Sequence, residues 1–259
     1  MLKELSIDAR KVSAGLVKFI ADGTGKAGFK KVILGLSGGM DSALIAFLAR
    51  EAIGKENVFG VIMPYQGSSG QDIKDADEVA KITGINSRSI SIDPMLDGFI
   101  KALPEMDHIR NGNVMARIRM IILYDQSKAL KALVLGSTNK TELLLGYGTI
   151  YGDMACALAP LGGLYKSQLR QLAKYLDLPE AVISKPPSAG LWPGQTDEEE
   201  LGLGYDEVDA LLYYMIDRRY DDNQLIKNGF SHGMISKVRG RVRSSEFKRK
   251  MPPAAEIKS

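Results

Sequence analysis

The residues from 31 to 52 restrict the fold of this chain more than any other segment. A short apolar run with β-branched residues, Lys31-Val-Ile-Leu-Gly-Leu36, leads into two glycines, and the residues from Asp41 to Ala52 have the apolar spacing of a helix. A buried strand, a tight turn and a helix in that order are typical of proteins with a parallel sheet. The pattern therefore predicts an α/β fold whose first strand ends at a glycine-rich turn.

The same alternation of strand and helix patterns continues along the chain. We expect strands at 58–63, 87–92 and 132–136 and helices at 2–21, 72–82, 113–130, 139–145, 165–176, 206–218 and 231–244. Strand patterns stop after residue 136, and residues 146–163 have the composition of a long glycine-containing loop. The sequence therefore predicts a parallel, Rossmann-like sheet followed by a helical C-terminal part. No linker or repeat divides the 259 residues, so we expect a single domain over 1–259.

Cysteine and histidine are too scarce for several kinds of site. Cys156 is the single cysteine, and His108 and His232 are the two histidines. An intramolecular disulfide is excluded and a Cys/His zinc site nearly so, and a bound metal would therefore be a hard cation held by oxygen atoms. We interpret Cys156 as a small buried residue and expect a cytoplasmic protein.

Charge and hydropathy argue against a nucleic-acid-binding protein and against a membrane protein. The 34 basic and 31 acidic residues give a net charge of +3, which is too small to indicate a nucleic-acid-binding protein. The first eleven residues are rich in charge and lead into no apolar signal segment, and no run approaches the roughly 18 apolar residues of a membrane span. We therefore expect neither a nucleic-acid partner nor a membrane association.

The segment Gly23-Thr-Gly-Lys-Ala-Gly28 matches the pattern G-x-G-x-x-G. A dinucleotide-binding fingerprint follows a strand and opens a helix, whereas this segment follows a predicted helix and precedes a strand. A Walker A loop fails as well, because Lys26 is followed by alanine and lacks the upstream glycine. We interpret residues 23–28 as a loop.

The segment Gly35-Leu-Ser-Gly-Gly39 matches the G-x-S-x-G turn of serine hydrolases, and it lies between a strand and a helix as that turn requires. Ser37 would then be the nucleophile. Such an enzyme also needs an acid followed by a histidine, and His232 lies in an amphipathic segment typical of structural or surface histidines. No oxyanion segment is visible, and a serine hydrolase remains the weaker alternative.

The longer string Leu36-Ser-Gly-Gly-Met-Asp-Ser42 indicates phosphate chemistry. The hydroxyls of Ser37 and Ser42, the amides at the glycines and a helix N-terminus form a cradle for an anion, and Asp41 offers a carboxylate to Mg²⁺. The string resembles the SGGxDS loop of the N-type ATP pyrophosphatases. Members of that superfamily use ATP to adenylate an acceptor and release pyrophosphate.

Four further motifs narrow the resemblance. They are Asn113-Val-Met-Ala-Arg-Ile-Arg-Met120, Gly136-Ser-Thr-Asn-Lys-Thr-Glu142, Leu164-Tyr-Lys-Ser167 and the segment from Lys185 to Glu198. In order and spacing they resemble ammonia-dependent NAD synthetases from about residue 5 to 255. The resemblance implies an adenine nucleotide alpha hydrolase-like fold without a glutaminase domain. It also implies amidation of deamido-NAD by ammonia and ATP, through an adenylated intermediate, with release of AMP and pyrophosphate.

The same resemblance assigns roles to individual residues. ATP would be bound by Gly35, Leu36, Ser37, Gly38, Gly39, Met40, Asp41, Ser42, Thr138, Lys166 and Ser188. Asp41 and Glu142 would hold Mg²⁺, and Asp41 and Lys166 would be the catalytic residues. Deamido-NAD would be bound by Arg117, Asp153 and Lys248. These roles suit the residue types, since carboxylates are hard oxygen ligands and lysine supplies a point charge to phosphate.

Three positions depart from the pattern of many family members. Ile150 stands where they carry a lysine, Ala157 where they carry an aspartate, and Phe247 where they carry the histidine of a His-Lys pair. All three family residues are linked to deamido-NAD. We therefore expect an active enzyme whose dinucleotide contacts differ from those of many relatives.

Two further expectations concern alternatives and assembly. The superfamily signature also fits an enzyme that amidates or thiolates another acceptor, and a non-catalytic adenine-nucleotide sensor. The segment 113–130 carries more apolar residues than one core-facing stripe needs, so the helix is buried on several sides. Burial within one subunit explains this nearly as well as burial between two. The family resemblance favours a homodimer.

Overall fold

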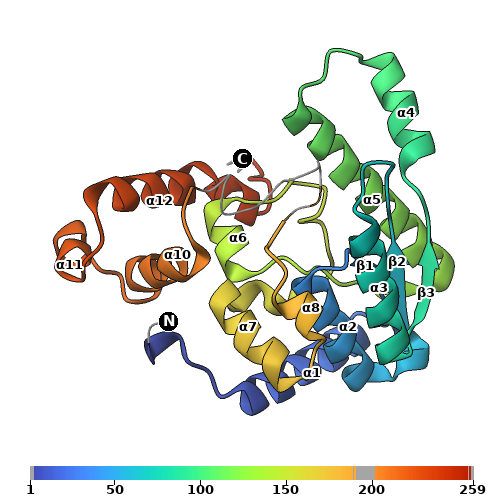
Figure 1. Ribbon diagram of the computed structural model, residues 1–259, viewed down its shortest axis with the longest axis horizontal. Helices are drawn as coiled ribbons and strands as arrows, with labels where there is room; N and C mark the ends of the chain where they lie inside the picture. Colours follow the sequence, from blue (N-terminus) through green and yellow to red (C-terminus); the bar gives the residue numbers. More distant parts are fainter. Residues whose placement is uncertain (1–2, 189, 191–201, 256, 258–259) are drawn as a thin grey trace.

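The computed structural model describes residues 3–188, 190, 202–255 and 257. Its sheet contains β1 (Lys31–Leu36), β2 (Val58–Ile62), β3 (Asn86–Ser89) and β4 (Ala132–Val134) in the order β3-β2-β1-β4. The first three of these strands are labelled in Figure 1. All three pairings are parallel, which confirms the predicted sheet. The strand expected at 87–92 is shorter and begins earlier, because β3 is an exposed edge strand whose alternation does not reflect a buried face.

Helices cover both faces of the sheet. On one face lie α2 (Met40–Ile53) and α3 (Gly70–Thr83), and on the other lies α5 (His108–Leu130). Successive side chains of β1 point to opposite faces: Val32 and Leu34 join the core against α2, whereas Ile33 joins the core against α5. This explains why β1 is a continuous apolar run, as strands buried on both faces are.

The first helix corrects the loop expected at 23–28. α1 runs from Ala9 to Lys26 and includes Gly23 and Gly25, with Thr24 buried. A Cβ atom on Gly23 would lie 2.8 Å from the side chain of Leu158, so a glycine allows the helix to approach this leucine closely. Tertiary packing therefore outweighs the low helix propensity of glycine here.

Several short helices have no counterpart in the sequence prediction. They are α4 (Asp93–Ala102), α8 (Glu180–Ile183), α11 (Asp222–Lys227) and the 3-10 turns Lys55–Asn57, Pro160–Gly163 and Glu246–Arg249. The 3-10 turn Lys3–Leu5 lies within the helix expected at 2–21, which in the structure begins only at Ala9. α5 also begins five residues earlier than expected, at His108, where the side chain of Asp107 accepts a hydrogen bond from the Arg110 amide. Segments of one to three turns carry too little periodicity to be recognised from sequence.

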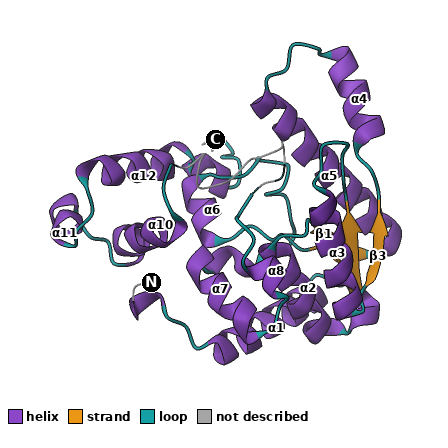
Figure 2. Ribbon diagram, viewed as in Figure 1, coloured by secondary structure: helices purple, strands orange, loops and turns teal. Residues whose placement is uncertain are grey.

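The described residues after β4 form helices joined by loops (Figure 2). The main ones are α6 (Lys140–Leu145), α7 (Lys166–Tyr175), α10 (Tyr205–Leu212) and α12 (His232–Ser244), and Tyr213–Asp217 continues α10 as a π-helical turn. They enclose a second core around Leu145, Tyr165, Leu211 and Val238, which confirms the helical C-terminal part. No described helix is long and apolar enough to cross a membrane.

Candidate active site

A cavity of about 700 Å³ opens at the carboxyl ends of β1, β2 and β4. Ser37, Met63 and Gly136 follow these strands and all line the cavity, together with side chains from α5 and from residues 146–155. Parallel α/β proteins bind their ligands at this edge of the sheet. The cavity therefore lies where the sequence places its phosphate motif.

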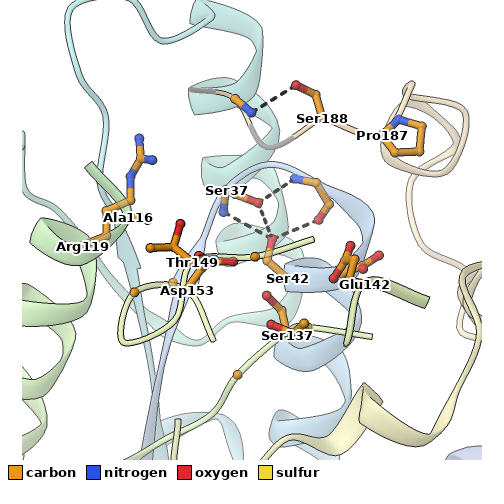
Figure 3. A pocket seen from close by; sticks show the side chains of 18 of the residues that line it. Ser37, Ser42, Ala116, Arg119, Ser137, Glu142, Thr149, Asp153, Pro187 and Ser188 are labelled. Atoms are coloured by element: carbon orange, nitrogen blue, oxygen red, sulfur yellow. Dashed lines mark hydrogen bonds between the residues drawn. The ribbon is translucent and has the colours of Figure 1, made fainter. Parts of the chain in front are cut away.

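The phosphate loop, residues 35–42, is stabilised by its own serines (Figure 3). The Ser42 hydroxyl donates to the Gly39 carbonyl at 2.9 Å, accepts from the Ser37 amide at 3.2 Å and lies 3.1 Å from the Ser37 hydroxyl. Gly39 caps α2 without a side chain, so no side-chain group occupies the first amides of the helix. These amides remain available to an anion.

Gly38 is the one residue of the phosphate loop that does not line the cavity. Its φ of +77° is left-handed, and a Cβ atom would lie 2.2 Å from the Asp72 carbonyl on α3. Its own carbonyl accepts from Lys185, which pairs with Asp72 and Asp75. The loop is thus packed against α3 at a point that only glycine can occupy.

Asp41 and Lys166 form an ion pair in the cavity, although 125 residues separate them in the sequence. The Lys166 ammonium lies 2.7 Å from Asp41 Oδ1, with side chains only 8% and 12% exposed. The Asn139 amide group donates to Asp41 Oδ2 at 2.8 Å, and the Asn139 backbone N–H donates to Glu142 Oε2 at 3.1 Å. The buried Asn139 therefore holds both predicted metal ligands in one network.

A buried carboxylate from the C-terminal part fixes the helix that carries Lys166. Asp209 on α10 accepts from the Thr141 hydroxyl at 2.5 Å and from the Ser167 amide at 2.7 Å, and Thr141 accepts from the Lys166 amide. Two N–H groups of the first turn of α7 are thereby satisfied by other helices. Burial raises the pKa of the Asp209 carboxyl.

The opposite wall of the cavity is formed by α5 and the loop at 146–155. Arg119 lies on this wall, and in Figure 3 it is on the other side of the view from Glu142, with the phosphate loop between them. Thr149 donates from its hydroxyl to Asn113 and from its amide to Asp153, both at 2.8 Å. Solvent in the cavity reaches the Asp153 side chain. The protein around its carboxyl still displaces part of the surrounding water, and this desolvation raises the pKa of the carboxyl. This wall therefore combines a cation and a carboxylate beside the phosphate loop.

A sequence model of the NAD synthase family matches residues 12–252. The chain belongs to this NAD synthase family. Two relatives have the name NH(3)-dependent NAD(+) synthetase. The one from Trichlorobacter lovleyi is 48% identical over 99% of this chain and 94% of its own length, and the one from Fusobacterium nucleatum is 44% identical over 99% and 100%.

Solved structures of the NAD synthase family have the same fold. The NH3-dependent NAD synthetase from Campylobacter jejuni, in complex with the nitrate ion, has a TM-score of 0.84 and 38% identity over 97% of this chain and 100% of its own. The NMN synthetase from Francisella tularensis has a TM-score of 0.86 and 32% identity, again over 97% of this chain and 100% of its own. These neighbours confirm the adenine nucleotide alpha hydrolase-like fold.

Most ATP and metal residues expected from the resemblance meet in the cavity. Those that line it are Gly35, Leu36, Ser37, Gly39, Met40, Asp41, Ser42, Thr138, Glu142, Lys166 and Ser188. The Ser188 hydroxyl accepts from the Gly190 amide at 3.1 Å. Residues 189 and 191–198 of the motif that begins at Lys185 lie outside the described part of the chain. The roles of these residues in this NAD synthase family member stay predictions.

Of the three predicted acceptor-binding residues, only Asp153 lines the cavity within the described part of the chain. Arg117 is exposed and donates to the Ile150 carbonyl at 3.3 Å. Lys248 donates to the Gly146 and Gly148 carbonyls at 2.8 Å, and partial burial lowers the pKa of its ammonium group. Both residues therefore support the loop that carries Asp153.

The three departing positions have distinct surroundings. The Ile150 carbonyl accepts from Arg117, Ala157 donates its amide to the Val134 carbonyl beyond the end of β4, and Phe247 is 61% exposed. Ile150 thus contacts Arg117, and Phe247 directly precedes Lys248 in the sequence. Two of the three positions, Ile150 and Phe247, therefore lie in or beside segments that contact the loop carrying Asp153.

Sequence reasoning missed four residues of the site, namely Arg119, Ser137, Asn139 and Asp209. Arg119 lies two positions after Arg117 and Ser137 directly before Thr138, within two of the family motifs, and both line the cavity. The capping pattern at Asn139 and Glu142 was visible in the sequence, because an asparagine followed three residues later by a glutamate is a helix-start signal. Nothing local to Asp209 distinguishes it from the neighbouring acidic residues.

Proposed function

We propose that this chain is an ammonia-dependent NAD synthetase, a ligase that converts deamido-NAD to NAD and cleaves ATP to AMP and pyrophosphate. The observation that supports this best is the network of Asp41, Lys166, Asn139 and Glu142 beside the phosphate loop. The names of the curated relatives support the same activity. A serine hydrolase is not favoured, since the Ser37 hydroxyl interacts with Ser42 and the Gly39 amide.

ATP binds with its phosphates over the phosphate loop. The Ser37 and Ser42 hydroxyls and the first amides of α2 are hydrogen-bond donors for phosphate oxygens, and Lys166 supplies a positive charge at the same end. Thr138 and Ser188 complete the ATP-binding part of the wall. Because the backbone of α2 fixes its free amides and Asp41 holds Lys166 in place, these donors need little reorganisation when charge develops on the leaving pyrophosphate.

Magnesium fits the carboxylates of this end. Asp41 and Glu142 both line the cavity, and both are oriented by Asn139. Among the described residues no three His, Cys, Asp or Glu side chains gather around one point, as an all-protein metal site would require. Two carboxylates completed by substrate phosphates are a usual magnesium site. The bound ion would neutralise negative charge on the phosphates.

The reaction needs no side-chain nucleophile. An oxygen of the nicotinate carboxylate attacks the α-phosphorus of ATP, and pyrophosphate leaves with the electron pair of the broken P–O bond. Ammonia then adds to the carboxyl carbon of the adenylate, loses a proton and displaces AMP, which leaves the amide. The protein contributes by holding the carboxylate and the α-phosphate together in one cavity.

Free ammonia is the proposed nitrogen source. The chain matches 48% of the length of the glutamine-dependent NAD+ synthetase from Acinetobacter baumannii and about the full length of the ammonia-dependent enzymes. Ammonium ions must lose a proton before they can attack. Activity at limiting total ammonium therefore rises with pH until another group titrates.

The likeness to an NMN synthetase gives a second candidate acceptor, the corresponding mononucleotide acid. A single assay separates the possibilities. Purified protein is incubated with ATP, magnesium and ammonium, and with either deamido-NAD or nicotinate mononucleotide, and AMP, pyrophosphate and the amide product are quantified together. Equimolar AMP and NAD from deamido-NAD is the expected result. Preference for the mononucleotide, or labelling of Ser37 by a fluorophosphonate, would contradict it.

We propose that a second copy of the chain covers the apolar face of α4 and α5. Large apolar side chains are exposed there, namely Met95, Phe99, Ile100, Leu103, Ile109, Ile121 and Tyr124. An exposed face of this kind is typical of an interface between subunits. Light scattering at micromolar concentration is expected to give twice the chain mass. Ile121→Glu should give the single chain mass, whereas Phe19→Glu on α1, an exposed apolar control, should not.

We place the reaction in the cytoplasm. The chain consumes ATP, and its one cysteine suits a reducing compartment. Fractionation of the cells that make the protein tests this location, and recovery of the activity outside the cytoplasmic fraction would contradict it.

A further inference from the structure

Arg119 has a charge that the described residues leave unpaired. Its Nε donates to the Met63 carbonyl at 3.1 Å, but its two terminal nitrogens form no hydrogen bond with any described residue, and it appears in none of their ion pairs. The residue is partly buried and lines the cavity. A guanidinium removed from water without a partner is costly, so this arrangement favours an anionic ligand.

The anchor of Arg119 lies directly beside the phosphate loop. In the register of the sheet Leu36 pairs with Ile62, so the next residues along the two strands, Ser37 and Met63, are neighbours. Adjacent strands lie about 4.8 Å apart. The carbonyl that fixes Arg119 therefore lies at the same edge of the sheet as the first serine of the phosphate loop.

The two cations of the cavity have different surroundings. Lys166 is paired with Asp41 at the phosphate end, next to the loop hydroxyls and amides. Arg119 is on the wall that also carries Asp153, and the charge of Asp153 acts on it without an ion pair. An acceptor carboxylate placed near Asp153 would be repelled unless a cation lay between them. The planar fork of a guanidinium is suited to a carboxylate.

We infer that Arg119 binds the reacting carboxylate of the acceptor and thereby distinguishes the acid substrate from the amide product. This inference rests on the proposed amidation. The terminal nitrogens donate to one carboxylate oxygen while the other oxygen attacks the α-phosphorus. After pyrophosphate leaves, the same donors face the carbonyl oxygen of the adenylate. Addition of ammonia places negative charge on that oxygen, and the charge disappears when AMP is expelled and the nitrogen loses its proton.

Substitution of Arg119 tests the inference through ligand selectivity. Dissociation constants for deamido-NAD and NAD are measured without ATP for the wild type, Arg119→Gln and Arg119→Lys. Arg110→Gln is the matched control, because Arg110 lies on the same helix and donates to the exposed Glu105 carbonyl. Steady-state KM values are measured separately for deamido-NAD and ATP. Thermal melting checks that each variant is folded.

The wild type should bind the acid more tightly than the amide. Arg119→Gln should reduce that preference by about ten- to a hundredfold and raise the KM for deamido-NAD, with the KM for ATP unchanged. Arg119→Lys keeps the charge without the fork and should fall between the two. An equal loss of acid and amide binding, or a rise confined to the KM for ATP, would overturn the inference. If Arg119→Gln does not fold, an undiminished acid preference in Arg119→Lys would also overturn it. Wild-type synthesis of NAD establishes the amidation independently of these outcomes.

Discussion

The two ends of the cavity differ in how completely the protein satisfies its own polar groups. At the phosphate end the Ser37 hydroxyl is hydrogen-bonded to the Ser42 hydroxyl. Asp41 forms an ion pair with Lys166 and accepts a hydrogen bond from Asn139. At the acceptor end Arg119 is held by one backbone carbonyl and has no carboxylate partner among the described residues. On the proposed assignment, the phosphate end is organised before ATP binds, whereas the acceptor end is completed by its ligand.

The two ends also arise differently from the sequence. The phosphate end is built largely from two short segments, 35–42 and 136–142, that each follow a strand. The acceptor end combines the middle of α5, the loop at 146–155 and support from Lys248 near the C-terminus. Changes at the first end should therefore affect chemistry and ATP, and changes at the second should affect the acceptor.

The largest effect is expected at the two carboxylates of the phosphate end. Asp41→Asn and Glu142→Gln preserve shape but each removes a charged oxygen, so kcat should fall about a hundredfold or more. Both variants should stay folded, because an amide oxygen can still accept from Lys166 or from the Asn139 backbone N–H. Quenched-flow measurement of AMP release at saturating magnesium checks this. A near-normal rate in either variant would contradict the metal assignment.

A substitution at Gly38 tests whether the phosphate end depends on its backbone. Gly38→Ala forces a Cβ atom into the Asp72 carbonyl at a left-handed φ, so the loop must shift and the KM for ATP should rise about tenfold. The KM for deamido-NAD should change much less. Gly15→Ala is the control, since a Cβ atom at this site in α1 meets nothing within 4 Å and should stabilise the fold by about 0.5–1 kcal/mol. Equal effects on both KM values would contradict the separation of the two ends.

Asp209 should affect the phosphate end from a distance. Asp209→Asn retains one of the two accepted hydrogen bonds, so we expect a loss of about 1–3 kcal/mol in the free energy of unfolding. Displacement of α7 moves Lys166, and kcat should fall about tenfold with little change in the KM for deamido-NAD. Glu207→Gln, an exposed site on the same helix, is the control. A variant with lower stability and normal kcat would show that Asp209 does not position Lys166.

The raised pKa of Asp209 also gives a dependence of stability on pH. In the window between the ordinary carboxyl pKa and the raised folded value, the native protein binds more protons than the unfolded chain. The contribution of this residue to stability therefore falls as pH rises through that window. Denaturant unfolding at several pH values should show this slope in the wild type and a smaller one in Asp209→Asn. Identical slopes would contradict the assignment.

The smallest effect is expected at Arg117, on the supporting side of the acceptor end. The residue is exposed and makes one long hydrogen bond to the Ile150 carbonyl. Arg117→Gln should raise the KM for deamido-NAD about threefold, leave the KM for ATP unchanged and alter the free energy of unfolding by less than about 0.5 kcal/mol. A larger change in KM than that of Arg119→Gln would reverse the order of the two arginines at this wall.

Sequence patterns predicted most of the sheet and most of the phosphate end. β1 was expected at the residues where it occurs, and the serines and Asp41 of the phosphate loop line the cavity as expected. At the other end the sequence predicts Arg117, whereas Arg119, two positions further along α5, is the one of the two that lines the cavity. Residues i and i+2 point in different directions on a helix, and only the packing of α5 on the sheet decides which of them faces the cavity.

By itself the sequence determined the features that depend on neighbouring residues, namely the strand, the glycine turn and the helix start that form the phosphate loop. Backbone preferences and local hydrogen bonds specify such features over a few residues. The tertiary structure decided the pairing of Asp41 with Lys166, the attachment of Asp209 to α7, the extension of α1 through Gly23 and the exposure of Arg119 to the cavity. Each of these depends on burial and close approach between distant segments, which no local pattern encodes.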